Sequence, residues 1–388
     1  MTGDSVSAEG PTLEHLLRHE YGKLVSMLCD ARGLSALADA QVTAERVLSA
    51  AQAKWTAAGV PERPQTWLAR EAQLGDGVGA YDSLLRFMLA CCHPELSRDR
   101  QLALTLKIAC GFDGGAIARA QSIEEADVKS QLAGARSTIR ERDIELSDLE
   151  GEALDTRLSA LCQCLYAIHE RGIAGLDVDP ATRAELCHEA MRLGLFLNER
   201  LPGRAELGAL MALMCLRNAR APDPGQGGIA ELIFEEHDRA GLDRDLMQRG
   251  LKYLGDAASG RGVTTYHLEA SIVAKHCMAD SSPSTDWAGI QELYLQLVAI
   301  RPHPEVRLRL AFASSKVDGA AAGLAHLDGL RDDPRLADSP LLDAAFVQFY
   351  AALGADDDAR RHLDRALQRL ATEAQRALLS RRFRKLAR

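Results

Sequence analysis

The sequence predicts an all-α protein, and three observations support this fold class. Alanine and leucine dominate the 388 residues, whereas Phe, Trp and Tyr together make up only 5% of them. Both dominant residues lose little conformational freedom in a helix. Apolar residues recur with helical spacing through most of the chain, and strand-like runs of Val, Ile, Thr and aromatic residues are scarce.

Length, charge and cysteine content limit the class of protein further. The length predicts two or three domains. The formal net charge of -9 disfavours a dedicated nucleic-acid binder, because such affinity comes largely from neutralising phosphates. Nine cysteines without a signal peptide predict reduced thiols and a cytoplasmic protein. No apolar run reaches the ~18 residues needed to span a bilayer, so we expect no membrane partner.

The first part of the chain predicts a leader followed by short helices. Residues 1–11 are polar and end in Gly-Pro, so they are expected to be disordered. Helical periodicity covers residues 12–58 and stops at Gly59 and Pro61. A further short helix is expected to start at about Gln65, before the glycine-rich break "GDGVG".

The pattern from Tyr81 to residue 148 predicts helices that include a helix-turn-helix. Ser97 is the expected N-cap of one of these helices. The stretch "GGAIARAQSIEEADVKSQLAGARSTIRERD" then predicts a short helix, a tight turn and a longer helix. Ala118 and Ile123 stand where such a motif needs small or apolar residues.

Residues 149–388 predict one helix after another, separated by breaks rich in Gly, Pro and Asp. From about Trp287 onward, the spacing of these breaks is typical of stacked helical hairpins of tetratricopeptide length. Cys162 and Cys164 lack a second cysteine pair at the spacing of a zinc site, so we expect them in the core.

Several stretches in order resemble one branch of the extracytoplasmic-function family of RNA polymerase sigma factors. The longest is "FMLACCHPELSRDRQLALTLKIACGFDGGAIARAQSI". That branch has a Cys-Cys-His-Pro stretch between two sigma domains, and a helical, tetratricopeptide-like extension. "GVPERPQTWLA" resembles the end of the first sigma domain, and "VDGAAAGLAHLDGL" resembles the extension. Together the matches cover most of the chain.

The resemblance implies a domain organisation and two partners. A truncated first sigma domain would occupy residues 12–75, a second with the helix-turn-helix residues 76–148, and a regulatory extension residues 149–388. The implied partners are core RNA polymerase and promoter DNA. In the recognition helix, the basic side chains placed to contact DNA are Lys129, Arg136 and Arg140.

The expected DNA-contacting positions nevertheless depart from the family pattern. Where the family continues after Trp67 with a strongly basic helix, Arg70 is the only basic residue. In the recognition helix, the basic residues usual in the family are replaced by Gln131, Gly134, Ser137 and Thr138. Acidic residues occupy its first turn, namely Glu124, Glu125 and Asp127. We expect weak or absent promoter binding, because losing several phosphate contacts costs orders of magnitude in affinity.

A second set of departures places His and Glu residues in the extension. The family's Asn-Glu-Gly-Tyr turn is replaced by "HERG", and its Tyr-Gln-Leu-Gln by "YHLE". Such side chains are ligands for zinc, iron, manganese or copper. Glu269 and His276 are seven residues apart, so they share a helix face. The candidate metal ligands are His169, Glu189, His237, His267, Glu269 and His276.

Two functions therefore remain open at the level of sequence. The first is a sigma-factor-like transcription regulator with weakened DNA binding and a regulatory helical extension. The alternative is a repurposed sigma-like protein whose extension binds a metal or a small molecule, as a metal-dependent enzyme of a specialised biosynthetic pathway. Against any metal site stands the ordinary interpretation of scattered histidines, which are mostly solvated or singly hydrogen-bonded.

Overall fold

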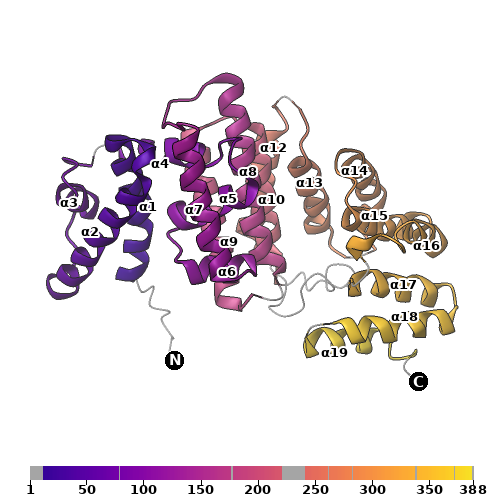
Figure 1. Cartoon of the computed structure of the whole chain (residues 1–388). Coiled ribbons are helices and arrows are strands. Elements are labelled where there is room, and N and C mark those ends of the chain that lie inside the picture. Colours follow the sequence, from indigo (N-terminus) through magenta and orange to yellow (C-terminus); the bar gives the residue numbers. More distant parts are fainter. Residues whose placement is uncertain are drawn as a thin grey trace, which may run out of the picture. The chain divides into compact units, whose positions relative to one another are not determined.

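The computed structural model describes residues 12–386 other than 78, 176–177, 221–240, 261, 282, 337–338 and 371. Every regular element in these ranges is helical, which confirms the predicted fold class (Figure 1). The chain forms two compact units, one up to Ala167 and the other from Ile168 onward. No helix within the described ranges is both long and apolar enough to cross a membrane. The predicted leader, residues 1–11, lies outside the described residues.

The first unit begins with helices whose ends follow local sequence signals. Its first elements are α1 (Leu13–Arg32), the 3₁₀ turn η1 (Leu34–Ala36), α2 (Leu37–Ala58), α3 (Pro64–Glu71) and α4 (Ala80–Cys91). The predicted stop at Gly59 is confirmed: this residue caps α2 with a φ of 83°. The short helix expected near Gln65 starts one residue earlier, at Pro64, a favoured first position.

The second half of this unit contains a pair of helices joined by a three-residue turn. The elements are α5 (Arg98–Leu104), the π-helical turn η2 (Thr105–Ala109), α6 (Gly114–Gln121) and α7 (Glu125–Glu141). The Asp113 side chain accepts a hydrogen bond from the Ala116 amide at 2.7 Å and caps α6. Ser122 ends α6 in the left-handed region. Ser97 does occupy the N-cap of α5, but its hydroxyl makes no capping hydrogen bond in the described part of the chain.

A close approach of two backbones joins these two halves. Gly22 in the middle of α1 lies so near η2 that a Cβ atom there would be 2.3 Å from the carbonyl oxygen of Ile108. One turn earlier, the Arg18 guanidinium lies over the Phe112 ring, 5.3 Å from its centroid. Side chains on both sides of the contact are buried, so the two halves pack as one body.

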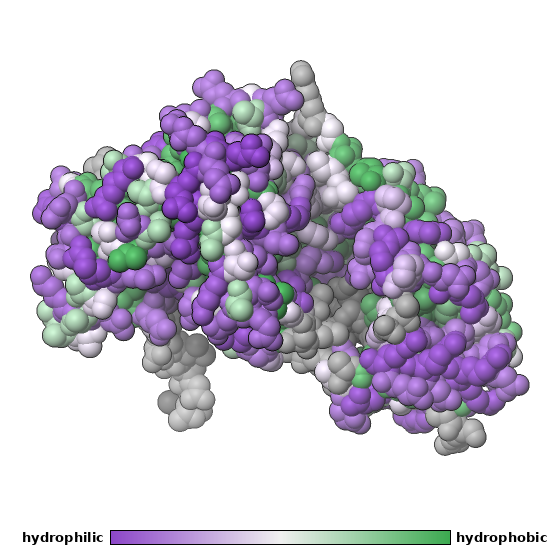
Figure 2. Space-filling view, viewed as in Figure 1, coloured by the Kyte–Doolittle hydropathy of each residue, from purple (hydrophilic) through white to green (hydrophobic). Residues whose placement is uncertain are grey.

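The surface of the first unit is polar on the face drawn in Figure 2. Hydrophilic residues predominate there, and hydrophobic ones are scattered. The large hydrophobic side chains exposed among the described residues of this unit include Val42, Val60 and Tyr81. Single exposed apolar residues of this kind are normal on a folded protein.

The second unit opens with a bundle around one apolar helix. Helix α8 (Gly151–Ala174) runs into this unit, and α9 (Pro180–Arg200), α10 (Ala205–Ala219), α12 (Arg244–Ala257) and α13 (Thr265–Met278) follow. In α10 every residue from Leu207 to Leu216 is buried. Helices α9, α12 and α13 all pack on it. A helix that is apolar all round is expected at the centre of such a bundle.

The remaining helices pack mainly on their neighbours in sequence. They are α14 (Trp287–Ile300), α15 (Pro304–Val317), α16 (Ala320–Asp328), η4 (Pro334–Leu336), α17 (Pro340–Ala352), α18 (Asp356–Arg369) and α19 (Glu373–Arg382). Each of these α-helices contacts the next α-helix along the chain. The core between α15, α16 and α17 contains the aromatic residues Phe312, Phe346 and Phe349. Successive antiparallel hairpins give this arrangement, because short connections keep consecutive helices side by side.

The contact at Gly22 predicts the effect of one added methyl group. Gly22→Ala should destabilise the protein by about 1–3 kcal/mol, because the obstructing atom is a backbone oxygen that cannot rotate away. Gly255→Ala is the control: that exposed helical position has no neighbour within 4 Å, so a gain of about 0.5–1 kcal/mol is expected. Urea denaturation followed by circular dichroism measures both, and equal effects at the two positions would contradict the packing described.

Candidate functional site

Helix α7 presents three different faces. Its apolar face packs into the first unit through Val128, Leu132, Ala135 and Ile139, which are all buried. Lys129, Ala133, Arg136 and Arg140 form a second face, because their spacing of four, three and four residues aligns them. This cationic face is rotated by one residue, about 100°, from the apolar face. All three basic residues predicted to contact DNA therefore lie on one side of the helix.

Part of the cationic face is turned toward the junction of α1 and α2. Arg136 and Arg140 line a cavity together with Leu34 and Leu37, and Arg136 is half-buried. Lys129 and Arg140 are exposed. The structure thus brings two of the three predicted DNA contacts to one half-open pocket at the surface, a position that the sequence pattern did not predict.

The third face of α7 is occupied by an arginine from α5. The Arg100 guanidinium donates a hydrogen bond to the Thr138 hydroxyl at 2.9 Å. A Cβ atom at Gly134 would lie 2.7 Å from the same guanidinium. Gly134 and Thr138 are two of the positions where the sigma family usually carries basic residues. A long basic side chain at either position would compete with Arg100 for this space. Gly134 and Thr138 are small enough to leave room for the Arg100 guanidinium.

The acid predicted in the first turn of α7 is exposed. Glu124, Glu125 and Asp127 all lie on the surface, with Lys129 the nearest exposed cation on the helix. Acidic groups at this end stabilise the helix through its dipole. They also place negative charge where a recognition helix would meet phosphate.

The single basic residue of the shortened helix α3 is paired. Arg70 donates to Asp76 from Nε at 3.1 Å and from Nη2 at 2.7 Å. Both side chains are about two-thirds exposed, at 68% and 66%, so the pair adds little stability. It does reduce the local positive charge that a DNA backbone would meet.

In the second unit, His169 is a buried neutral imidazole. It is 0% exposed, and its Nε2 lies 3.0 Å from Oδ1 of Asn218, which fits an imidazole protonated on Nε2. Burial, together with the positive charge of Arg217, lowers the pKa of His169 to about 3. Its Nδ1 has no hydrogen-bond partner among the described residues.

His267 uses both ring nitrogens to begin α13. Nδ1 accepts a hydrogen bond from the Thr264 amide at 3.1 Å, and Nε2 faces the Ala257 carbonyl oxygen at 3.4 Å. Thr264 completes a capping box with His267. A metal would have to displace these contacts.

The other described candidate ligands also have identified contacts. Glu189 is fully buried and accepts from Arg192, with Nη2 at 2.7 Å. Glu269 pairs with Arg301 at 2.7 Å, and the His276 ring packs edge-on against Trp287. His237 lies outside the described residues. Within the described ranges, no three His, Cys, Asp or Glu side chains form a group that could hold a metal ion.

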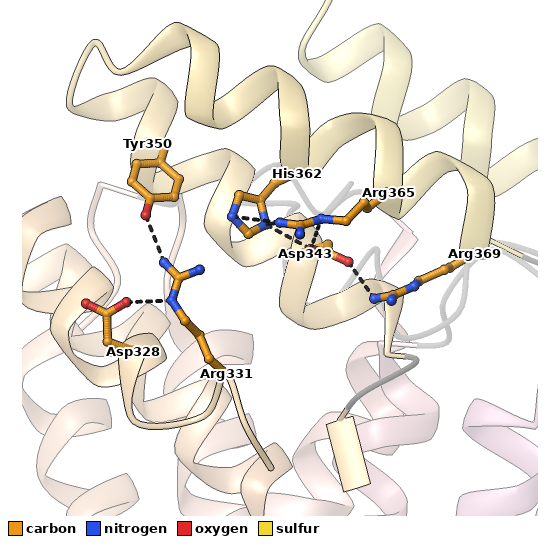
Figure 3. Close-up of polar contacts among 7 residues, drawn as sticks. All are labelled: Asp328, Arg331, Asp343, Tyr350, His362, Arg365 and Arg369. Carbon is orange, nitrogen blue, oxygen red and sulfur yellow. Dashed lines mark hydrogen bonds and ion pairs between the residues drawn. The ribbon is translucent and has the colours of Figure 1, made fainter. Parts of the chain in front are cut away.

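A polar cluster that the sequence did not single out lies between α17 and α18. Asp343 is buried, and Figure 3 shows three side chains of α18 converging on it. His362 Nδ1 lies 2.8 Å from Oδ1, Arg365 Nε 3.3 Å from Oδ1, and Arg369 Nη1 2.8 Å from Oδ2. The His362 ring also stacks on Phe346, with the two centroids 4.5 Å apart.

A second arginine contact flanks this cluster. Arg331 donates to Asp328 and to the Tyr350 hydroxyl, both at 2.9 Å (Figure 3). Its guanidinium carbon lies 4.1 Å from the centroid of the Phe346 ring. The spacing of His362, Arg365 and Arg369 on one helix face was visible in the sequence. Their common partner, Asp343, was not, because it belongs to another helix.

The predicted core position of Cys162 and Cys164 is confirmed, since both are at most 1% exposed. The Cys92 thiol hydrogen-bonds the Cys164 sulfur, and this contact raises the pKa of Cys92 and lowers that of Cys164. The Arg98 guanidinium also donates to the Gln163 carbonyl oxygen at 3.2 Å. These contacts fasten the segment after α4 to α8.

Comparison with known proteins finds one matching family and one relative, and the description of neither names an activity. Residues 157–258 match a family of unknown function, DUF6596. Over 311 residues the chain is 30% identical to "Uncharacterized protein R00370" of Rhizobium meliloti (strain 1021), which covers 79% of this chain and 73% of that protein. No solved structure matches the chain.

The buried His169 predicts a pH dependence of stability. The unfolded chain binds a proton at this imidazole below about pH 6.5, whereas the folded protein does not until about pH 3. Folding stability should therefore fall as the pH falls below 6.5. His169 alone accounts for about 2 kcal/mol between pH 7 and pH 5.

Urea denaturation of His169→Gln at both pH values tests this expectation. The loss of stability between pH 7 and pH 5 should shrink by about 2 kcal/mol relative to the unmodified protein. His303→Gln, at an exposed position, should leave the pH dependence unchanged. An unaltered slope in His169→Gln would contradict the buried neutral state.

The cluster around Asp343 predicts a second stability effect. Asp343→Asn should cost about 2 kcal/mol, because it leaves Arg365 and Arg369 near a buried position without their carboxylate. Both arginines remain partly in water, which holds the loss at this modest size. Asp358→Asn, which breaks the exposed pair with Arg361, should change the unfolding free energy by less than about 0.5 kcal/mol. Thermal or urea denaturation distinguishes the two, and equal losses would refute the role of the cluster.

Proposed function

The chain belongs to the same protein family as uncharacterized protein R00370 of Rhizobium meliloti, and we propose that it is a sigma-factor-like transcription regulator. In this proposal it binds core RNA polymerase, has weakened affinity for promoter DNA, and carries a regulatory helical extension. The observation that supports it is the α6–α7 helix pair, which packs on α5 and forms one compact unit with the preceding helices α1 to α4. This order of elements corresponds to the two sigma domains that the sequence resemblance implies.

The helix pair has the features of a helix-turn-helix. Three residues join α6 to α7, and Ser122 supplies the left-handed turn between them. Ile117, Ala118 and Val128 are buried where the two helices meet. A motif of this kind places its second helix in the major groove of DNA.

Weakened DNA binding follows from the surroundings of α7. Two of its three predicted contacts line a surface pocket, one further face holds Arg100, and the first turn is acidic. A protein with so few available cations releases few counterions from DNA, and its affinity at physiological salt should be low. Binding to the polymerase would then have to provide most of the attachment to a promoter.

The extension supports the regulatory part of the proposal. The helices from α14 to α18, each packed on the next, support this part, because tetratricopeptide-like repeats are stacked helical pairs that present extended surfaces to protein partners. The alternative function, an extension that binds a transition metal, has no group of three ligands in the described ranges. Co-purification with core polymerase is therefore the direct test of the proposed regulator.

The proposal predicts co-elution with core RNA polymerase in size-exclusion chromatography. It also predicts that promoter-length DNA alone is bound with a dissociation constant no tighter than about 10⁻⁶ M at physiological salt, the range of non-specific binding. Protein that neither co-elutes with the polymerase nor retards DNA at low salt would refute this function.

Neutralising the acidic turn should strengthen DNA binding. The triple variant E124Q/E125Q/D127N removes three negative charges near the expected phosphates, so affinity at 50 mM salt should rise about tenfold. The matched control D356N/D357N/D358N makes a similar change in the first turn of α18, and DNA affinity should stay the same. Fluorescence anisotropy with labelled duplex DNA measures both, and an equal rise in both variants would argue against contact through α7.

A further inference from the structure

The cavity between α7 and the α1–α2 junction has the composition of an anion site. Its volume is about 250 Å³, roughly that of eight water molecules. Leu34 and Leu37 are buried and form an apolar floor, whereas Arg140 lies at an exposed rim. The complete lining is Leu34, Ser35, Leu37, Ala38, Ala133, Arg136 and Arg140.

The charge of this lining is not balanced. Two arginines belong to the lining, and none of the described residues in it carries a carboxylate. Neither Arg136 nor Arg140 has an ion-pair partner in the part of the chain that the structure describes. Two arginines without an acidic partner favour an occupant that carries negative charge.

The backbone at the cavity wall adds to this preference. Leu37 and Ala38 are the first two residues of the 22-residue helix α2, and both line the cavity. No side chain caps this helix start at Ala36. The Leu37 amide already donates to the Leu34 carbonyl oxygen of η1, so this helix end contributes through its dipole, which favours a negative charge. This end of α2 and the two arginines therefore favour the same kind of ligand.

We propose that this cavity binds a small organic phosphate. Arg136 and Arg140 would hold the phosphate oxygens, since planar guanidinium groups match phosphate in a bidentate manner. Ser35 would donate a further hydrogen bond, and Leu34 and Leu37 would contact the apolar part of the molecule. The volume limits that part to about one small ring.

A ligand in this pocket would also affect DNA binding. This regulatory effect rests on the proposed function, whereas the ligand site itself does not. A bound phosphate compound connects α7 to the start of α2 and occupies two of the three cations on the cationic face of α7. DNA would then compete with the ligand for Arg136 and Arg140. The small-molecule site would lower the DNA affinity of the regulator when its ligand is abundant.

Isothermal titration of the full-length protein with phenyl phosphate, in phosphate-free buffer at low salt, tests the site. Phenyl phosphate should bind at least tenfold more tightly than inorganic phosphate, because only the former contacts the leucine floor. Arg140→Gln and Arg136→Gln should each weaken phenyl phosphate binding about tenfold or more. Arg119→Gln removes an exposed arginine of α6 outside the cavity and should leave the affinity unchanged.

A second variant tests the cavity without altering its charge. Ala133→Leu places a larger side chain in the lining at an exposed position of α7, where folding tolerates the change. Binding of phenyl phosphate should fall about tenfold although both arginines remain. Equal binding of phenyl phosphate to the unmodified protein, Ala133→Leu and Arg140→Gln would overturn the assignment, as would equal affinity for inorganic phosphate.

The DNA-binding assay separates this inference from the proposed function. Phenyl phosphate should reduce binding of labelled duplex DNA to the unmodified protein and have no such effect on Arg140→Gln. A protein that binds phenyl phosphate but neither DNA nor polymerase would retain the site and lose the proposed function. If Arg136→Gln and Arg140→Gln weakened DNA binding while phenyl phosphate did not bind at all, the arginines would be DNA contacts and the site would be refuted.

Discussion

The close contact between α1 and the π-helical turn η2 determines how the first unit is assembled. Because Gly22 has no side chain, the two backbones approach to a distance that excludes even a methyl group. A π-helical turn widens the helix locally and displaces its carbonyl groups, and such turns occur often at functional positions. Through this contact the α5–α7 segment packs on α1 and α2. The orientation of α7 within the unit follows from it.

That orientation explains the electrostatic character of the helix pair. The apolar face of α7 is held in the core, so its cationic face is turned toward η1 and the start of α2. Arg136 and Arg140 therefore line a pocket beside the start of α2. Acidic residues in the first turn stabilise the helix through its dipole and would repel a phosphate group. In the proposed function, local helix stability and DNA affinity are therefore opposed.

In the second unit, most of the candidate metal ligands predicted from the sequence have contacts that stabilise the fold. His267 begins a helix, Glu189 and Glu269 pair with arginines, and His169 is buried and neutral. The contacts of His267, Glu189 and Glu269 satisfy buried polar groups that would otherwise destabilise the fold. The helical hairpins from α14 onward use the same device between neighbouring helices, where Asp343 and His362 join α17 to α18.

The sequence by itself determined the helical class, most of the helix ends and the position of the α6–α7 turn. These features depend on local effects: residue propensity, glycine and proline at helix ends, and apolar spacing along one helix. It also placed Lys129, Arg136 and Arg140 on a common face, since helical geometry fixes that relation. The tertiary structure decided what this face meets. The pocket residues Leu34, Ser35, Leu37 and Ala38 beside Arg136 and Arg140, and the partners of Asp343, come from other helical segments. Helical periodicity carries no information about contacts between distant segments.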